Sequence, residues 1–236
     1  MNVITIANRK GGTGKTVTAY NLGFTYALQG KRICLVDLDS QANLTLLCGV
    51  EPVSLEGFKG AEVQRVNRNV DILPATKRFA MLENEINQLI DRNSYLRTEI
   101  VPKLQGYDHI IIDTPPALSI LNINSFCVSD RVFIVMNADY FSVSAIQEMR
   151  EILEQIKAIN PKLKYDLVLN AFFRNRNLTS SMVELLEEDP SFSGISIPYR
   201  QHIQNCVALR KPAIEVEDIH KPFLRLATLG GNHEEK

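Results

Sequence analysis

Cysteines are few in this chain, and they lie far apart. The 236 residues contain four of them, Cys34, Cys48, Cys127 and Cys206. Metal knuckles and disulfide frameworks typically show cysteines paired at short spacing, and this sequence has no such pair. The pattern therefore favours neither a metal knuckle nor a disulfide framework. Cys34 and Cys127 lie in apolar surroundings, and we interpret them as small core residues.

Long apolar runs and an excess of charge are also missing. No stretch approaches the roughly 20 apolar residues that a membrane span needs. Met1 leads directly into a strand-like run, with no charged leader and apolar signal core, so we expect a cytoplasmic protein. The formal net charge of −1 argues against a surface built entirely for nucleic acid, although it allows a local basic patch.

The composition is that of a globular chain. It is 45% hydrophobic and 22% charged, and it is long enough to bury one large core. No Gly/Ser-rich linker, internal repeat or low-complexity block divides it. We therefore expect a single domain over residues 1–229 and a flexible polar tail over residues 230–236.

Short apolar runs alternate with longer helical patterns, which predicts an α/β fold: a mainly parallel, twisted sheet with helices on both faces. The runs are continuously apolar, as expected of strands buried on both faces. The predicted strands are Val3–Ala7, Ile33–Asp37, Val70–Leu73, His109–Asp113, Arg131–Met136, Tyr165–Asn170 and Ile195–Ile197. The predicted helices are Lys15–Gln29, Phe79–Ile90, Tyr95–Leu104, Val143–Ile159 and Thr179–Glu188.

The strongest local signal is a glycine-rich segment between the first predicted strand and the first predicted helix. It consists of Lys10, Gly11, Gly12, Thr13, Gly14, Lys15 and Thr16. Glycines let backbone N–H groups approach phosphate oxygens, and the helix N-terminus adds unpaired donors. In such loops the lysine before the hydroxyl residue contacts the β- and γ-phosphates, and the hydroxyl coordinates Mg²⁺. The segment predicts a nucleotide site, and the competing interpretation is a glycine-rich turn without a ligand.

The start of this loop departs from the general phosphate-loop pattern. The first glycine of that pattern would fall at position 9, where the chain has Arg9. A double glycine led by Lys10 is a distinct version of the loop.

Two acidic motifs end later predicted strands. Asp37 and Asp39 close the second strand, and Asp113 follows three consecutive isoleucines. Carboxylates at the carboxyl ends of parallel strands point into the crevice where such sheets bind ligands. We assign Thr16, Asp37 and Asp113 to a Mg²⁺ site, and Asp39 to orienting a water molecule for attack on the γ-phosphate. A helix cap or turn former is the other interpretation of a strand-end aspartate.

Together these motifs resemble those of one family. The lysine-led loop, the Asp-Leu-Asp-x-Gln-Ala-Asn run of residues 37–43 and the Ile-Ile-Asp-Thr-Pro-Pro run of residues 111–116 are similar to the ParA/Soj branch of the ParA/MinD superfamily of deviant Walker ATPases. The resemblance implies an ATP- and Mg²⁺-dependent partitioning ATPase that forms an ATP-sandwich homodimer. It also implies nonspecific DNA binding on the nucleoid, segregation of a plasmid or chromosome, and stimulation by a ParB-like centromere-binding or adaptor protein.

The same resemblance assigns individual residues. Lys10 is similar to the signature lysine that reaches the partner's nucleotide, and with Lys15 and Asp39 it forms the expected catalytic set. Val17 stands where a threonine is common, so the backbone N–H is left to contact the α-phosphate. The expected nucleotide-binding set is Lys10, Gly11, Gly12, Thr13, Gly14, Lys15, Thr16, Val17 and Asn170, the last at the adenine.

Candidate DNA contacts lie in the last third of the chain. They are Arg174, Arg176, Arg200, Arg210 and Lys211, among acidic residues that leave residues 170–211 with a net charge of +1. Ordinary solvated charge is the alternative interpretation. Dimerisation would double any patch near the interface, and each neutralised phosphate adds affinity.

Other functions stay open at this stage. A MinD-like or other cargo-positioning ATPase, for a protein compartment or a division site, would share the motifs. Residues 219–229 resemble a short amphipathic membrane anchor, but we expect Pro222 to limit a helix there to about two turns and its apolar stripe to pack on the domain. A metallocluster carrier would need paired cysteines. A noncatalytic scaffold is disfavoured by Lys10 and Asp39.

Overall fold

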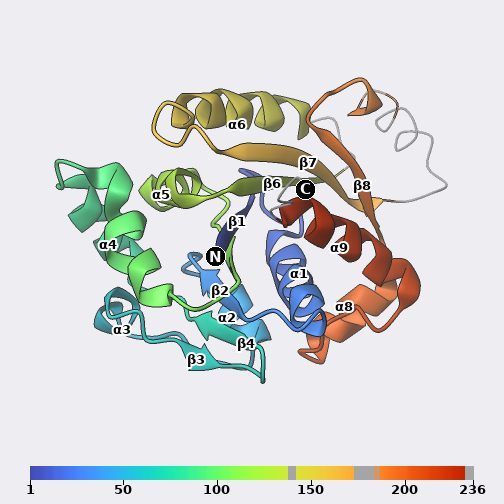
Figure 1. Cartoon of the computed structure of the whole chain (residues 1–236), viewed down its shortest axis with the longest axis horizontal. Helices are drawn as coiled ribbons and strands as arrows, with labels where there is room; N and C mark the ends of the chain where they lie inside the picture. Colours follow the sequence, from blue (N-terminus) through green and yellow to red (C-terminus); the bar gives the residue numbers. More distant parts are fainter. Residues whose placement is uncertain (138–141, 173–183, 185, 232–236) are drawn as a thin grey trace.

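A twisted, mainly parallel sheet forms the centre of the molecule (Figure 1). The computed structural model describes residues 1–137, 142–172, 184 and 186–231. Within them eight strands pair in the order β3-β4-β2-β5-β1-β6-β7-β8, and only β3–β4 is antiparallel. The strands are β1 Asn2–Ala7, β2 Ile33–Asp37, β3 Gln64–Arg65, β4 Val70–Leu73, β5 His109–Asp113, β6 Arg131–Asn137, β7 Lys164–Phe172 and β8 Phe192–Pro198. The predicted α/β class is confirmed.

Helices cover both faces of this sheet. They are α1 Lys15–Leu28, α2 Asn43–Leu47, α3 Leu55–Lys59, α4 Phe79–Asn87, α5 Ile120–Val128, α6 Ser142–Ile156, α8 Gln201–Ala208 and α9 Glu217–Gly230. Figure 1 shows α1, α8 and α9 on one side and α4, α5 and α6 on the other. Alternate strand residues follow this division: Ile33 and Leu35 pack with α1 and α9, whereas Cys34 and Val36 pack toward α4. Both faces are therefore core, as the continuously apolar strands predict.

Several predicted boundaries need correction. The predicted helix over 95–104 is a π-helix at Leu96–Ile100 followed by a 3₁₀-helix at Val101–Leu104. Pro102 has no N–H group to continue an α-helical ladder, which explains the change. The elements β3, α2, α3, α5 and α8 were not predicted. Of these, β3, α2 and α3 have only two to five residues and carry little periodic signal. The predicted helix over 179–188 falls largely on residues outside the described part of the chain.

The C-terminal helix α9 is longer than expected. It continues through Pro222 to Gly230 and buries Ile219, Phe223 and Leu226 against α1 and the sheet. The Tyr26 hydroxyl donates to the Ala227 carbonyl at 2.9 Å. The apolar stripe therefore packs on the domain, and Gly230 is a buried helical residue, not the start of the tail. No helix in the described ranges is long and apolar enough to cross a membrane.

Candidate functional site

The predicted site residues gather at the carboxyl edge of the sheet. Asp37 and Asp113 are directly opposite each other in the β2–β5 register, and Asn170 is opposite Asn137 in the β6–β7 register. β1 lies between β5 and β6, and the loop that leads from it to α1 passes between these two pairs. The sheet order thus brings an acidic pair and an amide pair to opposite sides of the phosphate-type loop.

Three asparagine amides hold this loop. Asn8 Nδ2 donates to the Val135 carbonyl at 2.7 Å, and its Oδ1 accepts the Lys10 N–H at 2.9 Å. Asn170 Nδ2 donates to the Thr13 carbonyl at 2.7 Å, and Asn137 Nδ2 makes a long contact of 3.5 Å to the Gly12 carbonyl. Side chains from β6 and β7, together with Asn8 directly after β1, therefore fix the shape of the loop.

Gly14 fits tightly at the point where the loop enters α1. Its φ of +91° lies in the left-handed region, which glycine adopts at little cost. A Cβ atom at this position would lie 2.0 Å from Asn170 Nδ2. The close approach of Asn170 to the loop therefore requires glycine here.

Lys15 is a buried cation at the start of α1. Its side chain lies among Asp113 and Asp39, and its Nζ donates to the Lys10 carbonyl at 3.3 Å. Burial lowers the pKa of Lys15, although the two carboxylates act in the opposite direction. An ammonium so poorly solvated is prepared to bind an anion.

The two buried aspartates differ in their partners. Asp37 Oδ2 accepts both the N–H (2.8 Å) and the hydroxyl (2.7 Å) of Thr45, and Oδ1 accepts the Asp39 N–H at 3.1 Å. Burial raises the pKa of Asp37 to about 6, although these hydrogen bonds oppose the shift. Asp113 is 1% exposed, and neither of its carboxylate oxygens has a donor of the described residues at full hydrogen-bond geometry, although the Thr16 hydroxyl lies close enough to favour the charged carboxylate and lower its pKa.

Burial and the neighbouring Asp37 raise the pKa of Asp113 well above its ordinary value, against the opposing effects of Thr16 and Lys15. An unpartnered buried carboxylate is costly in a native structure, and a bound cation is one of the few partners that would satisfy it. The described residues contain no group of three or more His, Cys, Asp or Glu side chains that could hold a metal ion alone. A cation here would thus need further oxygen ligands from hydroxyls, phosphates or water, as Mg²⁺ commonly has.

Asp39 lies in a tight turn that follows β2. Its carbonyl accepts the Ala42 N–H at 2.8 Å, and its Oδ1 accepts the Gln41 N–H at 2.9 Å. Buried Ala42 has a φ of +56°, which is uncommon for a residue with a side chain. Such outliers persist where the surroundings hold them. The half-buried Asp39 lies at the edge of the site, near enough to Lys15 to raise the pKa of that lysine.

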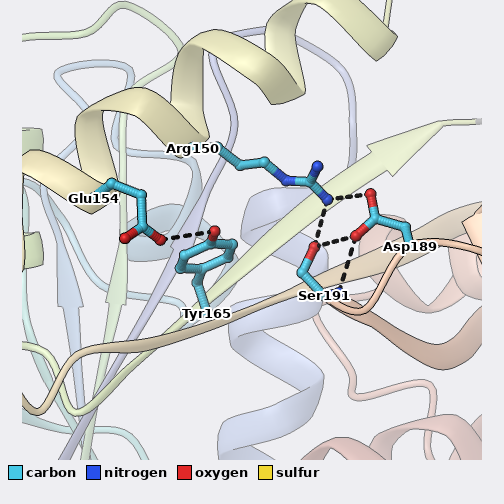
Figure 2. Close-up of polar contacts among 5 residues, drawn as sticks. All are labelled: Arg150, Glu154, Tyr165, Asp189 and Ser191. Carbon is cyan, nitrogen blue, oxygen red and sulfur yellow. Dashed lines mark hydrogen bonds and ion pairs between the residues drawn. The ribbon is translucent and has the colours of Figure 1, made fainter.

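Helix α6 contacts the same loop and is itself anchored. Arg9 forms an ion pair with Glu148 of α6. Figure 2 shows two further anchors of α6: Arg150 donates to Asp189 and Ser191, and Glu154 accepts from the Tyr165 hydroxyl at 3.0 Å. The helix thus connects the start of the loop to the segment that precedes β8.

The predicted DNA contacts are only partly described. Arg200 lies 4.0 Å from Asp218, and both side chains are largely exposed. Arg210 lines a pocket of about 380 Å³ together with Thr16 and Val17, so it lies beside the loop. Lys211 is exposed. Arg174 and Arg176 lie outside the described residues.

Three residues of this site were missed by sequence reasoning. Asn8 and Asn137 bind the loop, and Thr45 holds Asp37. Asn137 ends β6 and Asn8 follows β1, so amides at strand ends were the available signal. Thr45 carried no sequence signal, because only the fold brings its hydroxyl to Asp37.

The loop, the buried lysine and the strand-end aspartates on a parallel sheet define a P-loop nucleotide-binding fold. A family model described as an AAA domain matches residues 1–167. The chain is 35% identical over 178 residues to the sporulation initiation inhibitor protein Soj of Bacillus subtilis, covering 71% of this chain and 69% of Soj. It is 34% identical over 187 residues to the chromosome-partitioning ATPase Soj of Thermus thermophilus, covering 77% of this chain and 73% of that protein.

A solved structure agrees with these relatives. Cobyrinic acid a,c-diamide synthase from Mycobacterium smegmatis, with bound ADP and magnesium, superposes with a TM-score of 0.78 at 26% identity, covering 89% of this chain and 91% of that chain. The chain belongs to the ParA/MinD-type P-loop ATPases.

Proposed function

We propose that this chain is an ATP-dependent partitioning ATPase that segregates a plasmid or chromosome. In the proposed cycle it binds ATP and Mg²⁺, forms a homodimer around the nucleotides and binds nucleoid DNA without sequence preference. Hydrolysis is then stimulated by a ParB-like centromere-binding or adaptor protein. The relative from Thermus thermophilus, named as a chromosome-partitioning ATPase, supports this role, as does a solved structure of the fold with ADP and magnesium.

The carboxylate of Asp113 is the observation that carries the nucleotide part of the proposal. It is buried and unpartnered beside Lys15 and the loop. Asp113 and the Thr16 hydroxyl are the oxygen donors that suit Mg²⁺, and Asp37, already bonded to Thr45, would act through bound water. Mg²⁺ would supply charge neutralisation on the β- and γ-phosphate oxygens.

Lys15 is proposed to bind those phosphates directly. Its Nζ donates to the neutral Lys10 carbonyl, and anionic phosphate oxygens would favour the charged ammonium that burial disfavours. The backbone N–H groups of residues 11–17 would bind the remaining phosphate oxygens. Asn170, which now contacts the loop, is our candidate for the adenine.

Asp39 and Lys10 are proposed to act on the transition state. Asp39 lies at the edge of the site, where its carboxylate would orient the attacking water. Lys10 would reach the second protomer's γ-phosphate, where negative charge develops only as the bond breaks. A cation supplied by the partner makes hydrolysis depend on dimerisation.

DNA binding is proposed to follow the same dimerisation. Two copies of the cations around Arg200, Arg210 and Lys211, with Arg174 and Arg176, would then face one duplex. Contacts to backbone phosphates give sequence-independent binding that weakens steeply with salt.

The test uses Asp39→Ala, which leaves the phosphate-binding groups intact. With ATP and Mg²⁺ this variant should accumulate as a dimer in light scattering, lose hydrolysis, and shift nonspecific duplex DNA in a gel at low salt. With ADP it should be monomeric and leave DNA free. Lys211→Glu in the same background should lose the DNA shift and keep the dimer.

Two results would contradict the proposal. If Asp39→Ala hydrolyses ATP at the wild-type rate, Asp39 does not orient the attacking water. An ATP dimer without affinity for DNA would exclude the partition role and favour a cargo-positioning ATPase instead.

A further inference from the structure

A large groove lies at the edge of the sheet opposite to the phosphate loop. Its volume is about 870 Å³, and it is lined by the starts of β1, β6 and β7, by β8 and by the end of α9. We call it the cationic groove and define it by Arg131, Lys162, Lys164, Ile195, Leu224 and Arg225. Nothing in the proposed nucleotide chemistry uses these residues.

Positive charge dominates the lining. Arg131 is neutralised by its ion pair with Asp166. Lys162, Lys164 and Arg225 are exposed, and none of them forms an ion pair within the described part of the chain. The lining carboxylate, Asp130, is partly committed, because its Oδ2 accepts the Val3 N–H at 2.8 Å. Three cations thus remain available to an acidic partner.

Apolar side chains line the groove together with these cations. Ile195 is buried in β8, and Leu224 and Leu229 of α9 are accessible to different degrees. A volume of this size falls in the range of sites that enclose ligand groups. Recognition here therefore combines charge with apolar contact.

These features together favour one occupant. Lys162 and Lys164 lie two positions apart at the start of β7 and Arg225 lies on α9, all three exposed, which suits several carboxylates along an extended chain better than one small buried anion. A DNA duplex presents its phosphates on a convex surface and has no apolar side chains to pack on the exposed Leu224. We propose that the cationic groove binds an acidic segment of a partner protein that carries apolar side chains such as leucine.

This inference does not depend on the proposed partition function. Strand starts and strand ends of a parallel sheet lie at opposite edges, so the groove is distant from the residues that would bind nucleotide. A partner bound there would leave the phosphate loop accessible.

The experiment measures fluorescence anisotropy of the full-length protein with a fluorescein-labelled dodecapeptide of glutamates and leucines. Two control peptides carry glutamine for each glutamate or serine for each leucine. We expect saturable binding of the first peptide, weakened by salt, and weaker binding of both controls. The Lys162→Glu, Arg225→Glu double variant should lose about tenfold or more in affinity. The Lys31→Glu, Arg68→Glu control, exposed and outside the groove, should bind as the wild type.

Each other outcome overturns the proposal. Absence of peptide binding, or equal binding by both double variants, would exclude the groove as the binding site of an acidic segment. If the peptide with serine in place of leucine binds equally well, apolar contacts do not contribute to recognition in the groove. If the groove variant instead loses binding to duplex DNA while peptide binding is absent, the groove is a phosphate-contacting surface. Circular dichroism of each variant verifies that it folds.

Discussion

Asp37 and Asp113 face each other across the β2–β5 register, and both carboxylates are buried. Two adjacent carboxylates in low dielectric resist simultaneous ionisation, so the pair holds protons that the unfolded chain would release. With a pKa of about 6 against an ordinary 3.8, Asp37 makes the free energy of unfolding fall as the pH rises from about 4 to 6. Asp113 extends this fall in the free energy of unfolding to higher pH, because its pKa is raised as well.

The first prediction is that Asp113→Asn stabilises the protein in the absence of nucleotide and Mg²⁺. The amide carries no charge to bury, so at pH 8 the free energy of unfolding should rise by at least about 1 kcal/mol. At pH 4 the gain should shrink, because wild-type Asp113 is then protonated. Urea unfolding at both pH values measures the effect. A gain that is the same at both pH values would show that folding does not raise the pKa of Asp113, or that packing, not charge, is responsible.

The second prediction separates the two lysines of the loop. Lys15→Ala should weaken ATP binding by roughly 10- to 150-fold, since a charge-assisted hydrogen bond contributes about 1.5–3 kcal/mol. Lys10→Ala should retain the affinity of the monomer for ATP and lose ATP-driven dimerisation. Titration calorimetry and light scattering measure the two properties. Equal losses of affinity in both variants would contradict the separate roles.

The third prediction concerns the glycines of the loop. Gly14→Ala should destabilise the fold by about 2 kcal/mol or more, because the left-handed φ costs about 1–2 kcal/mol and Asn170 must also leave its place. Gly11→Ala is the matched control, since its Cβ would meet nothing within 4 Å. Chemical denaturation compares the two. Similar stabilities would show that the loop does not require the observed conformation at Gly14.

The fourth prediction concerns the anchor of α6. Arg150→Met should remove the bonds to Asp189 and Ser191 and lower the free energy of unfolding by roughly 1 kcal/mol, since this ion pair is only partly buried. Lys221→Met, which breaks the exposed pair with Glu217, should change nothing measurable. Hydrogen exchange of the β8 amides should rise only in the first variant. Unchanged exchange there would mean that α6 does not hold this segment.

Local patterns in the sequence determined much of the molecule. The strands β2, β4 and β5 begin and end where predicted, because each is a short apolar run bounded by polar residues. The loop around Lys15 and the aspartates at strand ends were equally visible, since residue type and position in a βα unit suffice for them. The hydrogen-bond partner of Asn170 could not be predicted from the sequence, because an amide side chain can bond a base, a turn or a loop.

Tertiary structure alone decided the rest. The sheet order places β1 between β5 and β6, and only this order brings Asn137 and Asn170 to the loop on one side and Asp113 on the other. The cationic groove joins Arg131, Lys164 and Arg225 from three separate elements, so no window of sequence contains it. Sequence patterns report on neighbours along the chain, whereas a parallel sheet with crossover helices makes neighbours of residues more than a hundred positions apart.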